Sequence, residues 1–202
     1  MREISTHAVF PQPVYVCELG RHLTTEEYQF FRQIRSQSHI NIGNWVSDDD
    51  YILERSEMAD IKSSIMVAIS EYSQKIAGYQ SNMKLYITQS WLNWTTAGEF
   101  HHRHFHHNSL VSGVLYIDVD ENLDSIVFHR REHNQLQPIY QNYNQFNSPD
   151  YTIKINNSML LLFPSDLSHS VDVKSGDNVR VSLAFNTFFK GTMGSERTKL
   201  TV

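Results

Sequence analysis

The amino-acid sequence predicts an α+β protein, mostly β, in which N-terminal helices brace one face of a β-sandwich or jelly roll. Two observations predict this class. Helical hydrophobic periods are confined to the first 82 residues, and short β-rich runs follow from residue 84 onward. Helices first and a run of strands afterwards is typical of α+β architectures.

Two helices are expected in the first half of the chain. The short one begins at Thr24-Thr25-Glu26-Glu27, where a hydroxyl cap and early acidic residues suit a helix N-terminus. The long one ends near Gly78 or Asn82 and carries one apolar stripe, which is expected to pack on the sheet. The stripe consists of Met58, Ile61, Ile65, Ile69, Tyr72, Ile76 and Tyr79.

Six β-rich runs follow, separated by Gly, Asn, Asp and Pro. They are 85–94, 110–118, 125–128, 151–155, 159–163 and 179–188. The stretch 129–150 is polar and also contains Tyr140, Tyr143 and Phe146. Because a loop of that length in a compact domain is usually functional or disordered, we expect a lid that faces the substrate.

The chain of 202 residues is expected to form one domain, since no repeat, linker or low-complexity tract divides it. Within it, residues 1–82 would give helical support, 83–190 the β core and 191–202 a C-terminal tail. The net charge bears on the kind of partner that the protein can bind. A net charge of −5 argues against nucleic-acid binding, which needs a cationic surface.

Neither the longest apolar run, Met159–Phe163, nor the N-terminus resembles a membrane span or a signal peptide. A cytoplasmic protein without a membrane partner is therefore expected. The single cysteine, Cys17, excludes an intramolecular disulfide and is expected to be structural filler. The oligomeric state is left open, a homo-oligomer included.

The segment 101–107 is the best candidate for a metal site, because five of its seven residues are histidine. No core needs so many imidazoles, since each buried one must find partners for two ring nitrogens. In a strand, alternate side chains share a face. His102, His104 and His106 would then point one way, and His101, Arg103, Phe105 and His107 the other. Two imidazoles at i and i+2 can bind one metal ion; the alternative is a surface tract that collects metals adventitiously.

A third ligand is expected far along the chain. His169 is the best candidate, because it follows an apolar strand that ends at Phe163-Pro164 and a turn. Eleven residues later comes Arg180, which would share one face of its strand with Ser182, Ala184 and Asn186. An inward-facing arginine is costly unless it meets an anion. With Ser182 it would form a carboxylate clamp; the alternative is an internal salt bridge.

In their order and spacing these features resemble the iron(II)/2-oxoglutarate-dependent oxygenases, in particular the prolyl-hydroxylase-related branch and a group of oxygenases common in marine bacteria and their phages. That group's pattern runs W-x-N, a glycine, H-x-H, S-x-x-S-G-x-x-Y, F-P-x-x-x-x-H and R-x-S-x-x-F-N. In this chain the motifs are Phe10-Pro-Gln-Pro-Val14, Trp91-Leu-Asn93, Gly98, His104-Phe-His106, Ser109-Leu-Val-Ser-Gly113 with Tyr116, Phe163-Pro164 with His169, and Arg180-Val-Ser182 with Phe185-Asn186. The resemblance covers nearly the whole chain.

The resemblance implies a double-stranded β-helix, of the jelly-roll or cupin-like kind, around one mononuclear iron. It implies that His104 and His169 bind Fe(II), with His106 where most of the superfamily has an aspartate. Arg180 would bind the distal carboxylate of 2-oxoglutarate with help from Ser182, and Asn93 and Tyr116 would line the cosubstrate site.

The third ligand departs from the usual two histidines and one carboxylate. Three arrangements are open. His106 ligates, or it stands aside and leaves a position for water or halide, or a carboxylate such as Asp166 or Asp124 reaches in. The first needs no rearrangement, so we expect a three-histidine site.

The resemblance implies an oxygenase that uses Fe(II), 2-oxoglutarate and O2 and releases succinate and CO2 while hydroxylating a peptide side chain or a small molecule. One alternative is a jelly-roll binding or structural protein whose histidines hold a stabilising ion. Another is a three-histidine, cupin-like dioxygenase that does not use 2-oxoglutarate, in which the clamp of Arg180 and Ser182 would have no purpose.

Overall fold

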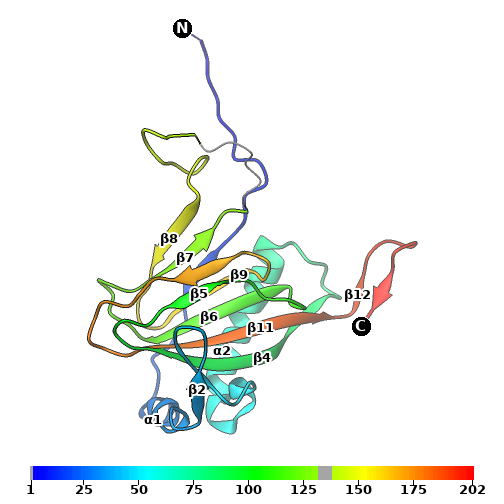
Figure 1. Ribbon diagram of the computed structural model, residues 1–202. Coiled ribbons are helices and arrows are strands. Elements are labelled where there is room, and N and C mark those ends of the chain that lie inside the picture. The colour runs from blue at the N-terminus through cyan, green and yellow to red at the C-terminus, as the bar shows by residue number, and fades with distance from the viewer. Residues whose placement is uncertain (1, 132–137) are drawn as a thin grey trace.

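The computed structural model describes residues 2–131 and 138–202, and its main body is two antiparallel sheets packed face to face (Figure 1). The larger sheet has the strand order β1-β9-β6-β11-β4-β3-β2, and the smaller one has the order β5-β10-β7-β8. Every strand pair within them is antiparallel. The predicted mostly-β class with a jelly-roll core is confirmed.

Six strands of the two sheets lie where the β-rich runs predicted, and five short strands are additional, one of them in the histidine-rich segment 101–107. The larger sheet contains β1 (Tyr15–Glu18), β2 (Ser38–Ile40), β3 (Trp45–Ser47), β4 (Lys84–Thr95), β6 (Val111–Asp118), β9 (Met159–Pro164) and β11 (Arg180–Lys190). The smaller sheet contains β5 (His101–His104), β7 (Ser125–His129), β8 (Asp150–Lys154) and β10 (His169–Val171). The sequence patterns did not predict β1, β2, β3 or β10, because runs of three or four residues are too short to show a period.

Helix α1 (Thr25–Ile34) begins where predicted. Its cap, Thr24, accepts a hydrogen bond from the Glu27 backbone, while the Glu27 carboxylate accepts one from the Thr24 backbone. This reciprocal capping box satisfies two amide groups that the helix itself leaves unpaired.

Helix α2 (Ala59–Glu71) follows two single 3-10 turns, Ile52–Glu54 and Ser56–Met58, and continues into a π-helical turn, Tyr72–Ile76. The predicted stripe is buried from Met58 to Tyr72, but Ile76 is 45% exposed. The wider turn explains the difference: the Ala77 amide bonds to the Tyr72 carbonyl, five residues earlier. That extra residue rotates Ile76 off the buried face.

Two hydrophobic clusters define the layers. One joins α1 and α2 to the outer face of the larger sheet, and Figure 1 shows α2 behind β4, β6 and β11. The other lies between the sheets and includes Tyr116 of β6, Phe163 of β9 and Phe128 of β7. The helices therefore brace one face of the larger sheet, and the opposite face is left for the site.

Strand β11 lies between β6 and β4 and shows the predicted alternation. Val181, Leu183 and Phe185 pack into the helix-side cluster. Arg180 and Ser182, which alternate with them along the strand, are buried and so face the space between the sheets. The sequence had therefore assigned the two faces of this strand correctly.

Both end segments of the chain contribute strands. Residues 1–82 supply β1, β2 and β3 to the larger sheet as well as the helices. Residues 191–202 form a small hairpin, β12 (Thr192–Met193) with β13 (Leu200–Thr201). No helix in the described ranges is long and apolar enough to cross a bilayer.

The predicted lid at 129–150 lies partly outside the described residues, which omit 132–137. Its described part, 138–149, extends beyond the ends of β7 and β8 (Figure 1). Arg130 fastens the base of this segment, because its guanidinium donates to the carbonyls of Ser148 and Gln145. Tyr143 and Phe146 are exposed, and the role of the segment as a lid stays a prediction.

A substitution at Gly113 in β6 would test how closely the layer between the larger sheet and the helices is packed. A Cβ at this position would overlap the ring of Phe185 and lie 2.8 Å from Leu162 Cδ2. Gly113→Ala is expected to destabilise the fold by about 1–3 kcal/mol through overpacking, measured by denaturant unfolding. Gly113→Ala combined with Phe185→Leu should recover part of that loss. An unchanged unfolding midpoint in the single variant would contradict this packing.

Candidate metal centre

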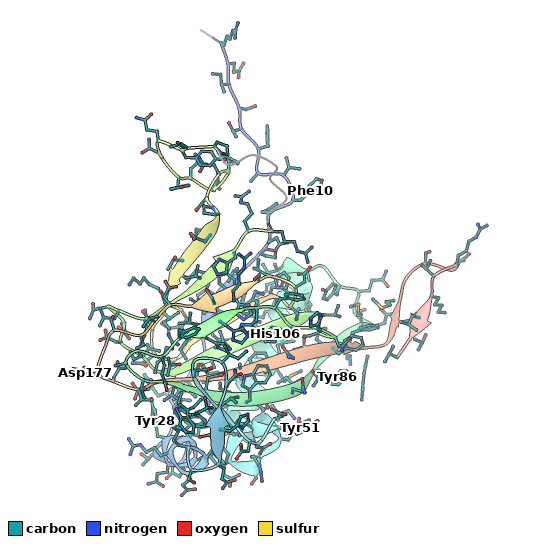
Figure 2. All side chains as sticks on the ribbon, in the orientation of Figure 1. Phe10, Tyr28, Tyr51, Tyr86, His106 and Asp177 are labelled. Atoms are coloured by element: carbon teal, nitrogen blue, oxygen red, sulfur yellow. The ribbon has the colours of Figure 1, made fainter. Side chains whose placement is uncertain are left out.

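His104, His106 and His169 form the group in the described chain that is arranged to hold a metal ion. One ring nitrogen from each lies within 4.8 Å of the other two. The pairing of β5 with β10 places His169 opposite His104, and the chain continues from His104 to His106. Figure 2 places the labelled His106 among the strands at the centre of the molecule.

Backbone carbonyls fix the tautomer of two of these rings. Nδ1 of His104 lies 2.8 Å from the His102 carbonyl oxygen, and Nδ1 of His169 lies 3.0 Å from the Leu167 carbonyl oxygen. A carbonyl only accepts, so each Nδ1 carries the proton and donates it. Nε2 of both rings is then left with a free lone pair for a metal, the arrangement that orients ligating histidines in metalloproteins.

Burial keeps the three rings neutral. It lowers the pKa of His169 to about 3, with the neighbouring His104 as the next cause. It lowers the pKa of His106 to about 4, again with His104 contributing, and it lowers the pKa of His104. A neutral imidazole is the form that binds a transition metal. The site therefore presents three uncharged nitrogen ligands at neutral pH.

Strict alternation along 101–107 was wrong for His101. Its ring stacks on that of His104, with centroids 4.4 Å apart and planes 19° from parallel, although the pattern had put the two on opposite faces. The cause is a β-bulge. His169 pairs with His104 and Val171 pairs with His101, so a step of two residues along β10 matches a step of three along β5. Burial lowers the pKa of His101 to about 2.

The other residues of the segment lie as the alternation predicted. Arg103, Phe105 and His107 are exposed, whereas His102 is half-buried beside the His104 ring. A solvated tract that collects metals adventitiously would not bury and orient its members in this way.

The two carboxylates considered as replacement ligands are both engaged elsewhere. Asp166 pairs with Arg131 at 2.5 Å and is half exposed. Asp124 is buried, and both of its oxygens lie 3.2 Å from Nζ of Lys174. Neither belongs to the histidine group, so the geometry favours His106 as the third ligand.

Arg180 is buried at the start of β11 and faces the space between the sheets. Its Nη2 donates to Oγ1 of Thr95 at 3.0 Å, and Nη1 lies 3.7 Å from Asp124 Oδ1. The internal salt bridge foreseen as an alternative is therefore present, but it is long. Burial lowers the pKa of Arg180, against the influence of Tyr116 and Asp124.

Ser182 and Tyr116 lie beside Arg180, because they are register partners on β11 and β6. Both are buried. Within the described chain no hydrogen bond uses the Ser182 or Tyr116 hydroxyl, and burial raises the pKa of Tyr116. Asn93 is the register partner of Ser182 on β4, but its side-chain oxygen Oδ1 accepts a hydrogen bond from Nδ2 of Asn44 at 3.3 Å.

Three further serines, Ser109, Ser112 and Ser165, form a hydrogen-bonded network with Asn186. Ser112 Oγ donates to Asn186 Oδ1 at 2.8 Å and contacts Ser165 Oγ at 2.9 Å, and Ser165 Oγ donates to Ser109 Oγ at 2.7 Å. This network ties β6, β9 and β11 together next to the histidines. It also orients Asn186, since the oxygen that accepts from Ser112 leaves the amide nitrogen facing away from that hydroxyl.

Two open hollows flank the histidine segment. One, of about 340 Å³, lies beside His106 and is lined by Val46, Asp50, Gln89, Trp91, Phe105, His106, His107 and Asn186. The other, of about 580 Å³, lies beside His104 and is lined by Arg103, His104, Phe105, His107, Arg131, Asp166 and Ser168. Phe105 and His107 border both. The Trp91 ring lies 5.7 Å from that of His106, and sequence reasoning had not assigned it a role in the hollow.

Residues 89–186 match the model of a protein family described as "Putative 2OG-Fe(II) oxygenase". The match runs from β4 to β11 and includes every candidate site residue. No curated protein matches the chain in sequence.

Several solved structures share the fold at low identity. HygX from Streptomyces hygroscopicus, with nickel, 2-oxoglutarate and hygromycin B bound, has 11% identity and a TM-score of 0.56 over 87% of this chain and 82% of its own. The viral collagen prolyl hydroxylase of Paramecium Bursaria Chlorella virus-1, in complex with 2OG, has 10% identity and a TM-score of 0.55 over 86% and 94%.

The carbocyclase SnoK from nogalamycin biosynthesis, described as non-heme and alpha-ketoglutarate-dependent, has 12% identity and a TM-score of 0.59 over 93% of this chain and 85% of its own. These likenesses confirm the double-stranded β-helix fold.

Single substitutions test the three-histidine group directly. Replacing His169 or His106 with alanine is expected to weaken Fe(II) or Mn(II) binding by at least about 100-fold, because a ligand costs more than the outer-shell partners whose loss costs 10–100-fold. His106→Asp should retain binding, since it restores the commoner carboxylate triad. Anaerobic metal titration measures both.

The matched control is His107→Ala, because His107 is exposed and lies outside the group. Full metal retention by His106→Ala would show that His106 stands aside, and full retention by His169→Ala would remove the proposed ligand set.

Proposed function

We propose that this chain is a 2OG-Fe(II) oxygenase that binds iron through His104, His106 and His169 and holds the distal carboxylate of 2-oxoglutarate at Arg180. The overall reaction couples oxidation of 2-oxoglutarate by O2, to succinate and CO2, with insertion of one oxygen atom into a substrate C–H bond. Bound iron supplies the redox chemistry. The chain's own residues bind, orient and exclude water.

One observation carries the assignment of the cosubstrate. Arg180, Ser182 and Tyr116 are buried together between the sheets, and their polar groups are largely unused within the described structure. A carboxylate placed among them would accept from the guanidinium and both hydroxyls, which is how arginine recognises such groups.

The clamp and the histidine group both lie near His101. The charge of Arg180 contributes to lowering the pKa of His101, and the His101 ring stacks on His104. His101 therefore lies near both Arg180 and the candidate metal position. A chelating ligand with a carboxylate at its other end fits this arrangement, whereas neither a structural ion nor a cupin-like dioxygenase needs the clamp.

Three neutral ligands would distinguish this site from the common triad. With His106 in place of a carboxylate, the metal keeps one more unit of positive charge. That charge favours anionic ligands such as a keto acid and bears on the reduction potential of the iron, which ligand charge and surrounding groups set.

We further propose that the substrate is a peptide side chain or a small molecule that enters beside His106. Trp91 offers an aromatic face there, and Asp50, Gln89 and Asn186 offer polar groups. Clefts that bind ligands combine apolar walls with a few convergent polar groups in this way. The neighbouring structures include one with hygromycin B bound and one collagen prolyl hydroxylase, so both substrate classes occur on this fold.

Turnover tests the proposal. Purified protein with Fe(II), 2-oxoglutarate and O2 is expected to form succinate, with a higher rate when a panel of peptides and polar metabolites supplies the substrate. The control is His169→Ala, which should form none. Wild-type protein that binds the metal but forms no succinate across the panel would contradict the oxygenase assignment.

Arg180 has its own prediction. Arg180→Ala should weaken 2-oxoglutarate binding by about 2–5 kcal/mol, the cost of removing one partner of a buried charged hydrogen bond. Calorimetry on the Mn(II)-loaded protein measures it, with metal affinity as the control because Arg180 does not ligate. An unchanged affinity would exclude Arg180 from the site.

A further inference from the structure

Lys174 is a fully buried lysine that the site described so far does not use. It lies in the segment between β10 and β11, and its side chain is 0% exposed. The backbone fixes this segment, because the Lys174 amide donates to the Glu99 carbonyl and its carbonyl accepts from the Gly98 amide. A charged group is rarely buried to this degree unless it is paired.

The partner of Lys174 is Asp124, which also lies beside Arg180. Nζ of Lys174 is 3.2 Å from both carboxylate oxygens, whereas Arg180 Nη1 is 3.7 Å from the nearer one. The Asp120 amide donates to Asp124 Oδ2 at 2.8 Å. Asp124 is therefore held by a lysine and a backbone amide and only approached by the arginine.

The buried cluster of Lys174, Arg180 and Asp124 carries a net positive charge. Two cations share one carboxylate, which leaves one positive charge in excess in a buried place. An isolated buried arginine and aspartate would form a short, bidentate pair that uses the guanidinium. Here the stronger contact of Asp124 is with Lys174, and the single hydrogen bond from Arg180 among the described residues goes to the neutral Thr95.

We propose that Lys174 is a positioning residue of the cosubstrate site: by engaging Asp124, it keeps the Arg180 guanidinium free for the distal carboxylate of the bound keto acid. The inference rests on the proposed function. Lys174 acts through Asp124 and does not touch the ligand itself, since its side chain has no exposed surface from which to reach one. Without the lysine, Asp124 would pair with Arg180 and compete with the ligand.

The test compares two keto acids that share the metal-chelating end. 2-Oxoglutarate has the distal carboxylate, whereas 2-oxopentanoate has a methyl group there. In calorimetry on the Mn(II)-loaded protein, Lys174→Met should raise the Kd of 2-oxoglutarate at least about tenfold. It should change the Kd of 2-oxopentanoate less than about threefold, because that ligand does not use the clamp.

Charge removal at both positions should reverse the loss. In Lys174→Met combined with Asp124→Asn, the competing carboxylate is gone, and the Kd of 2-oxoglutarate should return to within about threefold of wild type. Asp124→Asn alone should bind 2-oxoglutarate at least as tightly as wild type. These two variants decide the question even if Lys174→Met alone, with an unpaired buried aspartate, does not fold.

A matched lysine serves as the control. Lys62 pairs with Glu54 on the surface of the protein, so Lys62→Met should leave both affinities unchanged. The proposal is overturned if Lys174→Met binds 2-oxoglutarate as wild type does, if it weakens both keto acids alike, or if the double variant or Asp124→Asn binds poorly. Failure of wild-type protein to bind 2-oxoglutarate would instead overturn the proposed function.

Discussion

The pairing of β5 with β10 is the constraint on which the site depends. It brings His169 opposite His104 across more than sixty residues of chain, and the bulge in the same pair turns His101 onto His104. The rings of His104 and His169 then donate Nδ1–H to carbonyls two residues earlier in the chain. The register of one short strand pair thus sets the ligand positions, the tautomers and the stacking neighbour together.

The larger sheet forms the wall of the candidate site opposite the histidines, and its strand β11 contributes the positive charge of Arg180. Because β11 is bordered by β6 and β4, its alternation sends one set of side chains to the helices and the other toward the histidines. The apolar set anchors the strand in the core and thereby fixes the position of the polar set. A rigid scaffold of this kind preorganises polar groups for a ligand. The excess positive charge is stable because Asp124 lies within reach of both cations.

Much of this could be predicted from the sequence, and the failures have local physical causes. The alternation of β11 and the order and spacing of the motifs led to His104, His106, His169, Arg180 and Ser182 as candidate site residues. His101 was misplaced because strand alternation holds only without a bulge, and a bulge leaves no mark in seven residues. Lys174 and Asp124 lie in irregular segments fifty residues apart, where no period reveals burial. The hydrogen bond from the Asn44 side-chain amide to Asn93 Oδ1 joins residues 49 positions apart, which no local sequence pattern indicates.

The central claim is that three neutral histidines and one inward arginine bind the two ends of the same keto acid. The most direct measurement is a crystal structure of the Fe(II)-loaded protein with 2-oxoglutarate under anaerobic conditions. We predict His104, His106 and His169 in the coordination sphere and the distal carboxylate within hydrogen-bond distance of the Arg180 guanidinium. A carboxylate side chain on the iron in place of His106, or a distal carboxylate away from Arg180, would contradict it.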